Sequence, residues 1–390
     1  MANYENKLEM SYSGASNNET DMTNLAYNLS ADKVYCCLVN SDEASSETKN
    51  LVVPAVMFFL GVLGNVAALV ILTVRPSKDS KSTAFYHLVK ALACMDLFGI
   101  VASSPVTIVV YLKGGIFNTG GPPLCHYFSF ILVMAGNATL FTVLVMAAER
   151  FLVTKYPFKY SEVVTPKAVN ICILLLWGLS TLIAILPIVG VGGNIAPWPG
   201  TWCFFDYRST SSGGQAFSYF YAITGLLAII ITMVLNLIVI QHLWRMRRSR
   251  LVHSSFHSSQ DSGDSHNGGR GPDSEMRMVV LLMAIIVVFT VCYAPLMVRI
   301  IINQLWNVQP VKVPGGVDDA LDLWALRLAC VNQILDPWVY IISRVTCCDG
   351  SRRRDSYSRK HSAPKYHAIH TNSISAGQPH SSPHHGITAM

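Results

Sequence analysis

Residues 51–74 read LVVPAVMFFLGVLGNVAALVILTV, and this stretch decides the fold. It contains no charged side chain over its whole length. A bilayer core about 30 Å thick is crossed by roughly 20 consecutive apolar residues in a helix. The stretch therefore predicts a transmembrane helix over Leu51–Val74.

Six further apolar stretches of comparable length follow along the chain. They span Ala84–Leu112, Leu124–Val153, Ala168–Val191, Phe217–Trp244, Met278–Trp306 and Ala320–Ser343. The 390 residues are 51% hydrophobic and only 13% charged, whereas an average soluble domain is about a quarter charged. This composition excludes a disordered or collagenous chain. We expect an all-α protein, a bundle of seven transmembrane helices.

Connections rich in basic residues alternate along the chain with connections poor in them, and this pattern predicts the orientation in the membrane. The rich segments carry Arg75, Lys78, Lys81, Arg150, Lys155, Lys159, Lys167, Arg245, Arg247, Arg248, Arg250, Arg277, Arg344, Arg352, Arg353 and Arg354, and the poor ones only Lys113, Arg208 and Lys312. The N-terminal tail is acid-rich. We expect a plasma-membrane protein with its N-terminus outside. The modest net charge of +6 lies in loops, so no nucleic-acid partner is expected.

Three parts follow from this topology: an extracellular tail over residues 1–50, a seven-span domain over 51–346 and a disordered cytosolic tail over 347–390. The tail before Leu51 lacks an apolar signal segment, so the first span is expected to direct membrane insertion. A segment rich in Ser, His and Gly, Arg250–Asp273, is expected to be a flexible linker.

Several residues are candidates for covalent modification. Asn18 and Asn28 begin N-x-S/T glycosylation patterns on the outer tail. Cys125 and Cys203 both fall on the outer side, where a disulfide can persist; the alternative is two free thiols. Cys347 and Cys348 follow the last span beside basic residues, and are either palmitoylated or reduced thiols.

Polar residues within the spans mark a second set of candidates, because an ionisable group there costs about 2.5–3.5 kcal/mol on insertion scales. Asn65, Asp96, Asn332 and Asp336 lie at similar depth. They either hold a small cation, such as sodium at Asp96, or form a packing network only. Glu149 and Arg150 end the third span as a local ion pair or as interface anchors.

These residues fall in register with a known family. The chain from about residue 50 to 350 resembles the rhodopsin-like G-protein-coupled receptors, through Gly64-Asn65, Leu92-Ala93-Cys94-Met95-Asp96, Cys125, Glu149-Arg150-Phe151, Trp177, Cys292-Tyr293-Ala294-Pro295 and Asp336-Pro337-Trp338-Val339-Tyr340. The resemblance implies that Arg150 of the Glu149-Arg150 pair gates the G-protein cleft. It also implies that Asp336 and Tyr340 act as a switch and that Pro295 is a hinge.

The outer half of the bundle contains one conspicuous cation. Arg327 lies nine residues, about 13.5 Å of helical rise, outward of Asp336. A guanidinium offers a two-pronged donor to a carboxylate, and the surrounding outer halves are apolar, which suits an acidic lipid. The alternatives are that Arg327 extends to the interface or pairs with Asp322. The last span has no lysine for a retinal Schiff base, and Leu132 stands where amine receptors carry an acid.

The loop Pro197-Trp198-Pro199-Gly200-Thr201-Trp202-Cys203-Phe204 adds a narrower resemblance. Together with Ser104-Pro105-Val106-Thr107, Leu326-Arg327-Leu328-Ala329 and Asn332-Gln333-Ile334-Leu335-Asp336, it is similar to the prostanoid receptors. Val53-Pro54-Ala55-Val56-Met57-Phe58 and span six look most like the fourth E-type subtype.

This resemblance implies a receptor for prostaglandin E2 that couples to Gs, raises cyclic AMP and is regulated by arrestin and receptor kinases. Arg327 would bind the prostaglandin carboxylate, with Tyr111 and Thr201 as hydroxyl donors. Thr107 would face the ring or chain hydroxyls, Leu132 would line the tail and Trp202 would cap the pocket. Arg299 is expected to extend to the interface, or to be a second cation at the mouth of the pocket.

Some residues depart from the family pattern. Cys330 replaces a frequent Ser one turn from Arg327, and Tyr293 stands where relatives have Trp or Ser. The tail after Cys348 is short and rich in His and Ser, unlike the tail expected of the fourth subtype. A receptor for another prostanoid or small acidic lipid is the first alternative, and a seven-span transporter the second. The spans show no nucleophile–base pair and no cofactor motif, so no enzyme is expected.

Overall fold

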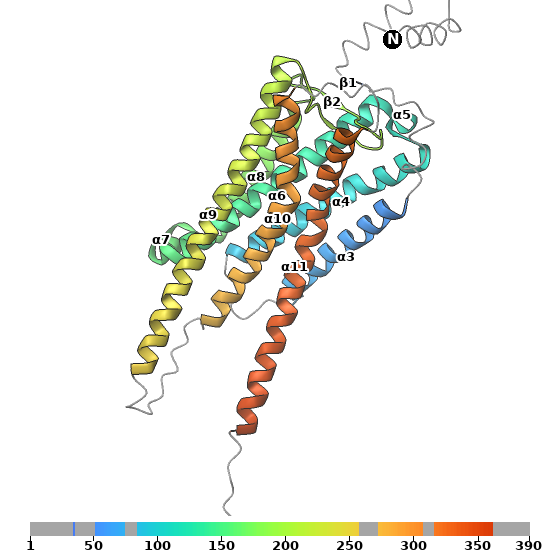
Figure 1. Ribbon diagram of the computed structural model, residues 1–390. Coiled ribbons are helices and arrows are strands. Elements are labelled where there is room, and N and C mark those ends of the chain that lie inside the picture. Colours follow the sequence, from blue (N-terminus) through green and yellow to red (C-terminus); the bar gives the residue numbers. More distant parts are fainter. Residues whose placement is uncertain (1–33, 36–50, 75–83, 257–271, 307–315, 362–390) are drawn as a thin grey trace, which may run out of the picture. The chain divides into compact units, whose positions relative to one another are not determined.

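The structure is a computed structural model that describes residues 34–35, 51–74, 84–256, 272–306 and 316–361. The described residues form seven long helices (Figure 1), with the bounds α3 Val52–Val74, α4 Ala84–Lys113, α6 Gly121–Lys155, α8 Pro166–Ile185, α9 Ser212–Phe256, α10 Pro272–Leu305 and α11 Val317–His361. Two short helices, α5 (Ile116–Thr119) and α7 (Pro157–Val163), flank α6. The predicted glycosylation sites Asn18 and Asn28 lie outside the described residues.

Each predicted span falls on one long helix, but some of the predicted bounds were wrong. α8 ends at Ile185 instead of Val191. Pro187 follows closely, and a proline lacks the N–H that a continuing helix needs and restricts the residue before it. α9 continues to Phe256, so the start of the predicted flexible linker is helical. α11 runs on to His361, past the start of the predicted tail, and includes Cys347 and Cys348.

Six of the described helices are long and apolar enough to cross a membrane: α3, α4, α6, α8, α9 and α10. α11 falls short by composition, because Arg327, Asn332, Gln333 and Asp336 interrupt its apolar sequence. The described residues up to Val345 belong to one compact unit and those from Thr346 to a second. This border lies beside the predicted end of the seven-span domain.

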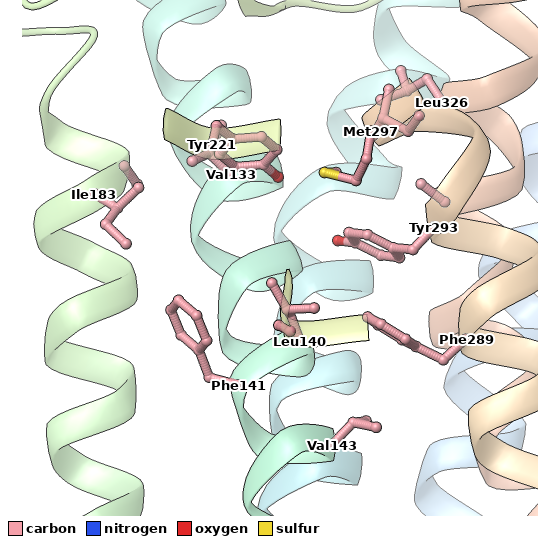
Figure 2. Close-up of a cluster of buried hydrophobic side chains, with 14 of the residues drawn as sticks. Val133, Leu140, Phe141, Val143, Ile183, Tyr221, Phe289, Tyr293, Met297 and Leu326 are labelled. Carbon is pink, nitrogen blue, oxygen red and sulfur yellow. The ribbon is translucent and has the colours of Figure 1, made fainter. Parts of the chain in front are cut away.

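α6 is the central helix of the first unit. Its most apolar window is 72% buried, compared with 28% for α3 and for α8. It packs against α4, α8 and α9. Figure 2 shows Phe289 and Tyr293 of α10 directed toward α6. The outward faces of α3, α8 and α9 carry exposed Val, Leu and Ile side chains, as expected of a surface that meets lipid and not water.

A small β-sheet is formed by the segment before α3 and the loop between α8 and α9. β2 (Asn194–Ile195) pairs antiparallel with β3 (Phe204–Phe205), and β1 (Val34–Tyr35) pairs parallel with β2. Cys203 immediately precedes β3 and is bonded to Cys125 of α6, with a Cα–Cα distance of 5.2 Å. The predicted disulfide is therefore present, and it fixes this loop to the central helix.

Glycines allow α3 to approach α11 closely. A Cβ atom on Gly64 would lie 2.7 Å from Nε1 of Trp338 and 3.1 Å from Cγ of Pro337. Trp338 also donates from Nε1 to the carbonyl of Leu60, at 3.3 Å. The proline ring and the bonded indole leave little freedom to make room at this contact.

We predict that Gly64→Ala lowers the free energy of unfolding by about 1–3 kcal/mol, the usual cost of overpacking. The measurement is the melting temperature of the purified protein in detergent, which should fall by several degrees. Gly178→Ala is the matched control, because Gly178 is an exposed helical glycine with nothing within 4 Å of an added Cβ. It should be neutral or slightly stabilising. Equal melting temperatures for the two variants would contradict the close approach of α3 to α11.

Candidate ligand-binding site

A cavity of roughly 120 Å³ lies among α3, α4, α6, α11 and the loop before Cys203. Its lining comprises Val53, Pro54, Met57, Ile100, Ser103, Ser104, Thr107, Tyr111, Phe128, Leu132, Thr201, Trp202, Leu323, Leu326, Arg327, Cys330, Gln333 and Ile334. All six residues predicted to bind a ligand are among them. These six residues come from α4, α6, α11 and the loop before Cys203. The structure therefore brings together side chains such as Thr107 and Arg327, which are more than two hundred positions apart in the sequence.

Helical spacing explains most of the lining residues that the sequence reading missed. On α4 the lining side chains recur at i, i+3, i+4, i+7 and i+11 from Ile100 to Tyr111, which is one face of a helix. On α11 the same spacing joins Arg327 to Cys330 and Ile334. Once Thr107 and Arg327 are placed, this periodicity finds their neighbours. The lining residues of α3 (Val53, Pro54 and Met57) include no charged or hydroxyl side chain that would have marked them in the sequence.

Two of the hydroxyl groups on α4 are bonded within their own helix. Ser103 donates to the carbonyl of Gly99 at 2.7 Å, and Thr107 donates to the carbonyl of Ser103 at 3.0 Å. Trp202 is 6% exposed, and its indole N–H has no hydrogen-bond partner among the described residues. An unpaired buried donor costs about 1–3 kcal/mol, so a ligand oxygen at this position would be favourable.

Arg327 is half-buried, lines the cavity and lies 5.7 Å from the ring of Trp324. The sequence left two alternatives for it: extension to the interface, or an ion pair with Asp322. Both carboxylate oxygens of Asp322 are bonded to other groups instead, namely Arg208, Arg299 and Asn303. Arg327 thus lies in the lining of the cavity, and its role in binding a ligand stays a prediction.

The loop holding Thr201 and Trp202 is fixed at several points besides the disulfide. The side chain of Asn194 is wholly buried and accepts from Ser129 of α6 at 2.6 Å, and its amide nitrogen lies 2.7 Å from Nδ1 of His126. The backbone N–H of Ile116 donates to the carbonyl of Gly200 at 2.9 Å. Gly200 has φ of +80°, a conformation that favours glycine. These contacts set the position of the two lining residues.

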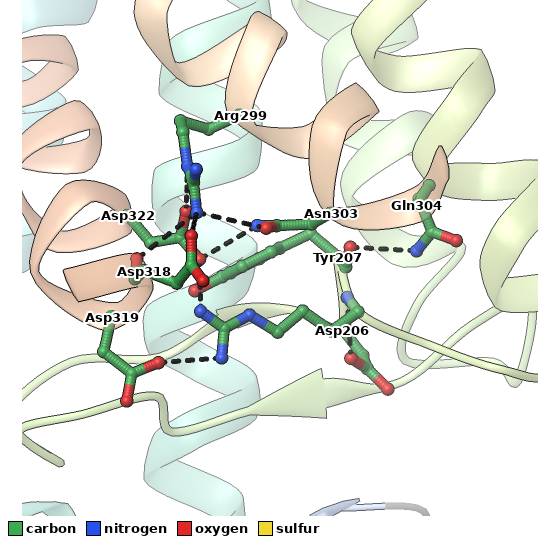
Figure 3. A network of polar contacts seen from close by, with 9 residues as sticks. Asp206, Tyr207, Arg299, Asn303, Gln304, Asp318, Asp319 and Asp322 are labelled. Carbon is green, nitrogen blue, oxygen red and sulfur yellow. Dashed lines mark hydrogen bonds and ion pairs between the residues drawn. The ribbon is translucent and has the colours of Figure 1, made fainter. Parts of the chain in front are cut away.

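Ion pairs connect the same loop to the outer turns of α10 and α11 (Figure 3). Arg208 contacts Asp319 at 2.8 Å and Asp322 at 2.6 Å, and Arg299 contacts Asp322 at 2.6 Å and Asp318 at 3.1 Å. Arg299 was expected to extend to the interface or to be a second cation at the pocket mouth. It is instead 14% exposed, paired with two aspartates and absent from the lining of the cavity. Its partners Asp318 and Asp322 lie 19 and 23 positions away on α11, so no local sequence signal predicted the pairs.

The loop also contains a buried acid beside Arg208. Asp206 accepts from the backbone N–H of Arg208 at 3.1 Å. Burial raises the pKa of the Asp206 carboxyl, and that hydrogen bond acts in the opposite direction. On the α10 side, Gln304 donates to the carbonyl of Tyr207 at 2.8 Å. The loop is thus held to α10 by a neutral hydrogen bond and to α11 by ion pairs.

The polar residues in the middle of the bundle are buried but only partly bonded to one another. Thr139 donates to Asp96 at 2.9 Å, Asn332 donates to Asp336 at 2.9 Å, and Asn65 donates to the carbonyl of Gln333 at 3.0 Å. One oxygen each of Asn65, Asp96, Asn332 and Asp336 has no partner among the residues described. The predicted inter-helix network is present in part, and the sodium ion at Asp96 stays a prediction.

Near the C-terminal end of α6, Glu149 and Arg150 form the local ion pair. Nε and Nη2 of Arg150 lie 2.5 and 2.6 Å from the two oxygens of Glu149, and both side chains are 5% exposed. Tyr160 of α7 donates to Glu149 at 2.7 Å, and the ring of Phe85 lies 4.5 Å from the guanidinium carbon of Arg150. Burial at this level excludes the alternative of simple interface anchors.

The remaining predicted switch residues lie on α10 and α11. Pro295 and Pro337 are inside these helices, and Tyr340 is fully buried. Tyr293, two residues before Pro295, stacks on Phe289 with ring centroids 4.8 Å apart. The side chains of Cys347 and Cys348 are not described, so palmitoylation stays a prediction.

Comparisons with known proteins agree with this geometry. Residues 64–340 match the family model of the 7 transmembrane receptor (rhodopsin family). The structure is similar to squid rhodopsin, with a TM-score of 0.62 and 20% sequence identity over 78% of this chain and 83% of that one, which shows a shared fold.

Curated relatives narrow the family further. The human prostaglandin E2 receptor EP4 subtype is 35% identical over 75% of this chain, and the match spans 64% of that receptor's length, slightly less than two thirds. The cattle EP4 receptor is 34% identical over 79% of this chain and 68% of its own, and the human prostacyclin receptor 32% over 74% and 71%. The chain therefore belongs to the rhodopsin family of seven-transmembrane receptors, and within it to the prostanoid receptors.

Proposed function

We propose that this chain is a plasma-membrane receptor for prostaglandin E2 that couples to Gs and raises cyclic AMP. The observation that carries the proposal is the cavity in which Arg327 shares the lining with Tyr111, Thr107, Thr201, Trp202 and Leu132. The relatives that match the chain include receptors named for prostaglandin E2 and for prostacyclin. Receptors of this family are not enzymes.

The lining suits a lipid with an acidic head. The guanidinium of Arg327 binds a carboxylate through two parallel N–H donors. Tyr111 and Thr201 add hydroxyl donors beside it, while the side chains of Leu132, Leu326 and Ile334 provide the apolar surface that a hydrocarbon chain requires.

The size of the cavity links binding to a change of conformation. Ligand pockets usually measure about 300–1,000 Å³, and this one measures roughly 120 Å³. A prostaglandin must therefore displace lining side chains, and it favours whichever conformation already has more room. The agonist then acts through its higher affinity for that conformation.

The cytosolic face follows from the same assignment. We place the N-terminus outside the cell, so that the Glu149–Arg150 pair and α7 face a G protein in the cytosol. Opening that pair frees Arg150 for the G protein. Arrestin and receptor kinases act on the same face once the receptor is active.

We predict that Arg327→Ala lowers the affinity for prostaglandin E2 at least about 30-fold, because a buried charge pair is worth about 2–5 kcal/mol. Arg327→Lys keeps the charge but loses the two-pronged geometry, so it should lie between Ala and the wild type. The measurement is radioligand binding to membranes, with surface expression quantified through an N-terminal epitope tag. Full affinity in a well-expressed Ala variant would disprove the role of Arg327.

A cyclic AMP assay across a panel of prostanoids tests the ligand class and the coupling together. We expect the largest response to prostaglandin E2. Silence toward every prostanoid, with a response to another small acidic lipid, would support the alternative receptor, which shares Arg327 and the apolar cavity. A fall of cyclic AMP would show a different G protein.

We predict that Tyr160→Phe raises basal cyclic AMP about two- to tenfold. The variant removes one hydrogen bond to Glu149, worth about 0.5–1.5 kcal/mol, from the state in which Arg150 is held closed. Tyr156→Phe is the control, because Tyr156 is exposed and its ring packs on Phe151. Basal signalling that rises equally in both variants would contradict a specific role for the Tyr160 contact.

A further inference from the structure

Four charged side chains are buried together where the loop meets the outer turns of α10 and α11 (Figure 3). Arg208 and Asp319 are each 9% exposed, Arg299 14% and Asp322 4%. Asp322 is the centre of the group. Its carboxylate accepts from Arg208 and Arg299 at 2.6 Å each and from Asn303 at 2.9 Å.

This group adjoins the cavity. Asp322 precedes Arg327 by five residues on α11, about 7.5 Å of helical rise, and Leu323 and Leu326 between them line the cavity. Trp202 lines the cavity as well, and it also borders a small void beside Arg299 and Asp322. Asp319 and Asp322 therefore lie on the order of 10 Å from an anion that is bound to Arg327.

At this distance the charge of an acid matters for an anionic ligand. Buried charges are screened by salt much less than exposed ones. Two unit charges about 10 Å apart, at the effective dielectric constant near a protein surface, change an equilibrium on the order of tenfold. Without the arginines, Asp319 and Asp322 would repel the same carboxylate that Arg327 attracts.

We propose that Arg208 and Arg299 are specificity residues that never touch the ligand: they neutralise Asp319 and Asp322, which would otherwise repel a lipid carboxylate at Arg327. The proposal rests on the proposed function, since it concerns a ligand with an anionic head. Asp318 is 45% exposed and its charge is solvated. Asp206 adds a further acid beside Arg208, so the test compares variants that differ by single charges.

The experiment measures affinity for prostaglandin E2 and for its uncharged 1-amide, by competition on membranes. Arg208→Gln leaves one more negative charge, and the affinity for the acid should fall on the order of tenfold while that for the amide changes less than twofold. Asp319→Asn removes one negative charge, and the affinity for the acid should rise several-fold. The double variant Arg208→Gln/Asp319→Asn should return to within about threefold of the wild type.

A purely structural role gives a different pattern, because all three variants lose the same ion pair. It predicts that acid and amide lose affinity together, and that the double variant is not restored. Either result overturns the proposal. Should Arg208→Gln fail to reach the cell surface, the other two variants still decide between the two roles. Asp319→Asn raises the acid-to-amide ratio in the proposal alone, and the double variant keeps near wild-type affinity for the acid in the proposal but loses it in a structural role.

Lys113→Gln is the matched control for a lost positive charge, because Lys113 ends α4 on the same side of the bundle but is exposed. It should change the acid-to-amide ratio less than twofold, and a change as large as that of Arg208→Gln would overturn the role of burial. A wild-type receptor that binds acid and amide equally would disprove the role of Arg327. If the wild type prefers the acid and the charge variants show the same acid-to-amide ratio as the wild type, only the role of Arg208 and Arg299 is disproved.

Discussion

A helix in a lipid bilayer must satisfy its own backbone hydrogen bonds, because the hydrocarbon offers no partner. Apart from the turns at Pro105 and Pro295, the backbone of α3, α4, α6, α8, α9 and α10 is therefore occupied by its own hydrogen bonds, and mainly side chains remain to bind, signal or join helices. Apolar side chains meet the lipid at no cost. Each polar side chain within a span is expensive, and those discussed above lie at three levels: the cavity, the middle of the bundle and the C-terminal end of α6.

The outer level depends on a loop that lies outside this constraint. The Cys125–Cys203 bond attaches the loop to α6, and Asn194 adds hydrogen bonds to Ser129 and His126. The aromatic side chains of Phe204, Phe205 and Tyr221 pack together against α9. The loop is consequently a fixed wall of the cavity and not a loose cover. Its fixed position allows Arg208 to reach two aspartates of α11.

The sequence predicted those structural features that are determined within a single segment of the chain. Helix formation in lipid needs only length and apolar composition, so the seven long helices were found, and their ends were misjudged only where Pro187 stops α8 or where polar residues continue a helix, as in α9. Arg327 was singled out because a charged group in an apolar span is conspicuous, and Thr107 because of the resemblance to the prostanoid receptors. The ion pairs of Arg299 were not predicted, because its partners are on another helix.

The hydroxyl groups of Ser103 and Thr107 have a chemical consequence for whatever enters the cavity. Each already gives its proton to a carbonyl of α4, so only the lone pairs on oxygen remain for a guest. These two groups can therefore accept a hydrogen bond from a guest alcohol but cannot donate one to a guest ketone. A lipid whose alcohol at this position is oxidised to a ketone would lose its contact with them, although its acid group stayed intact.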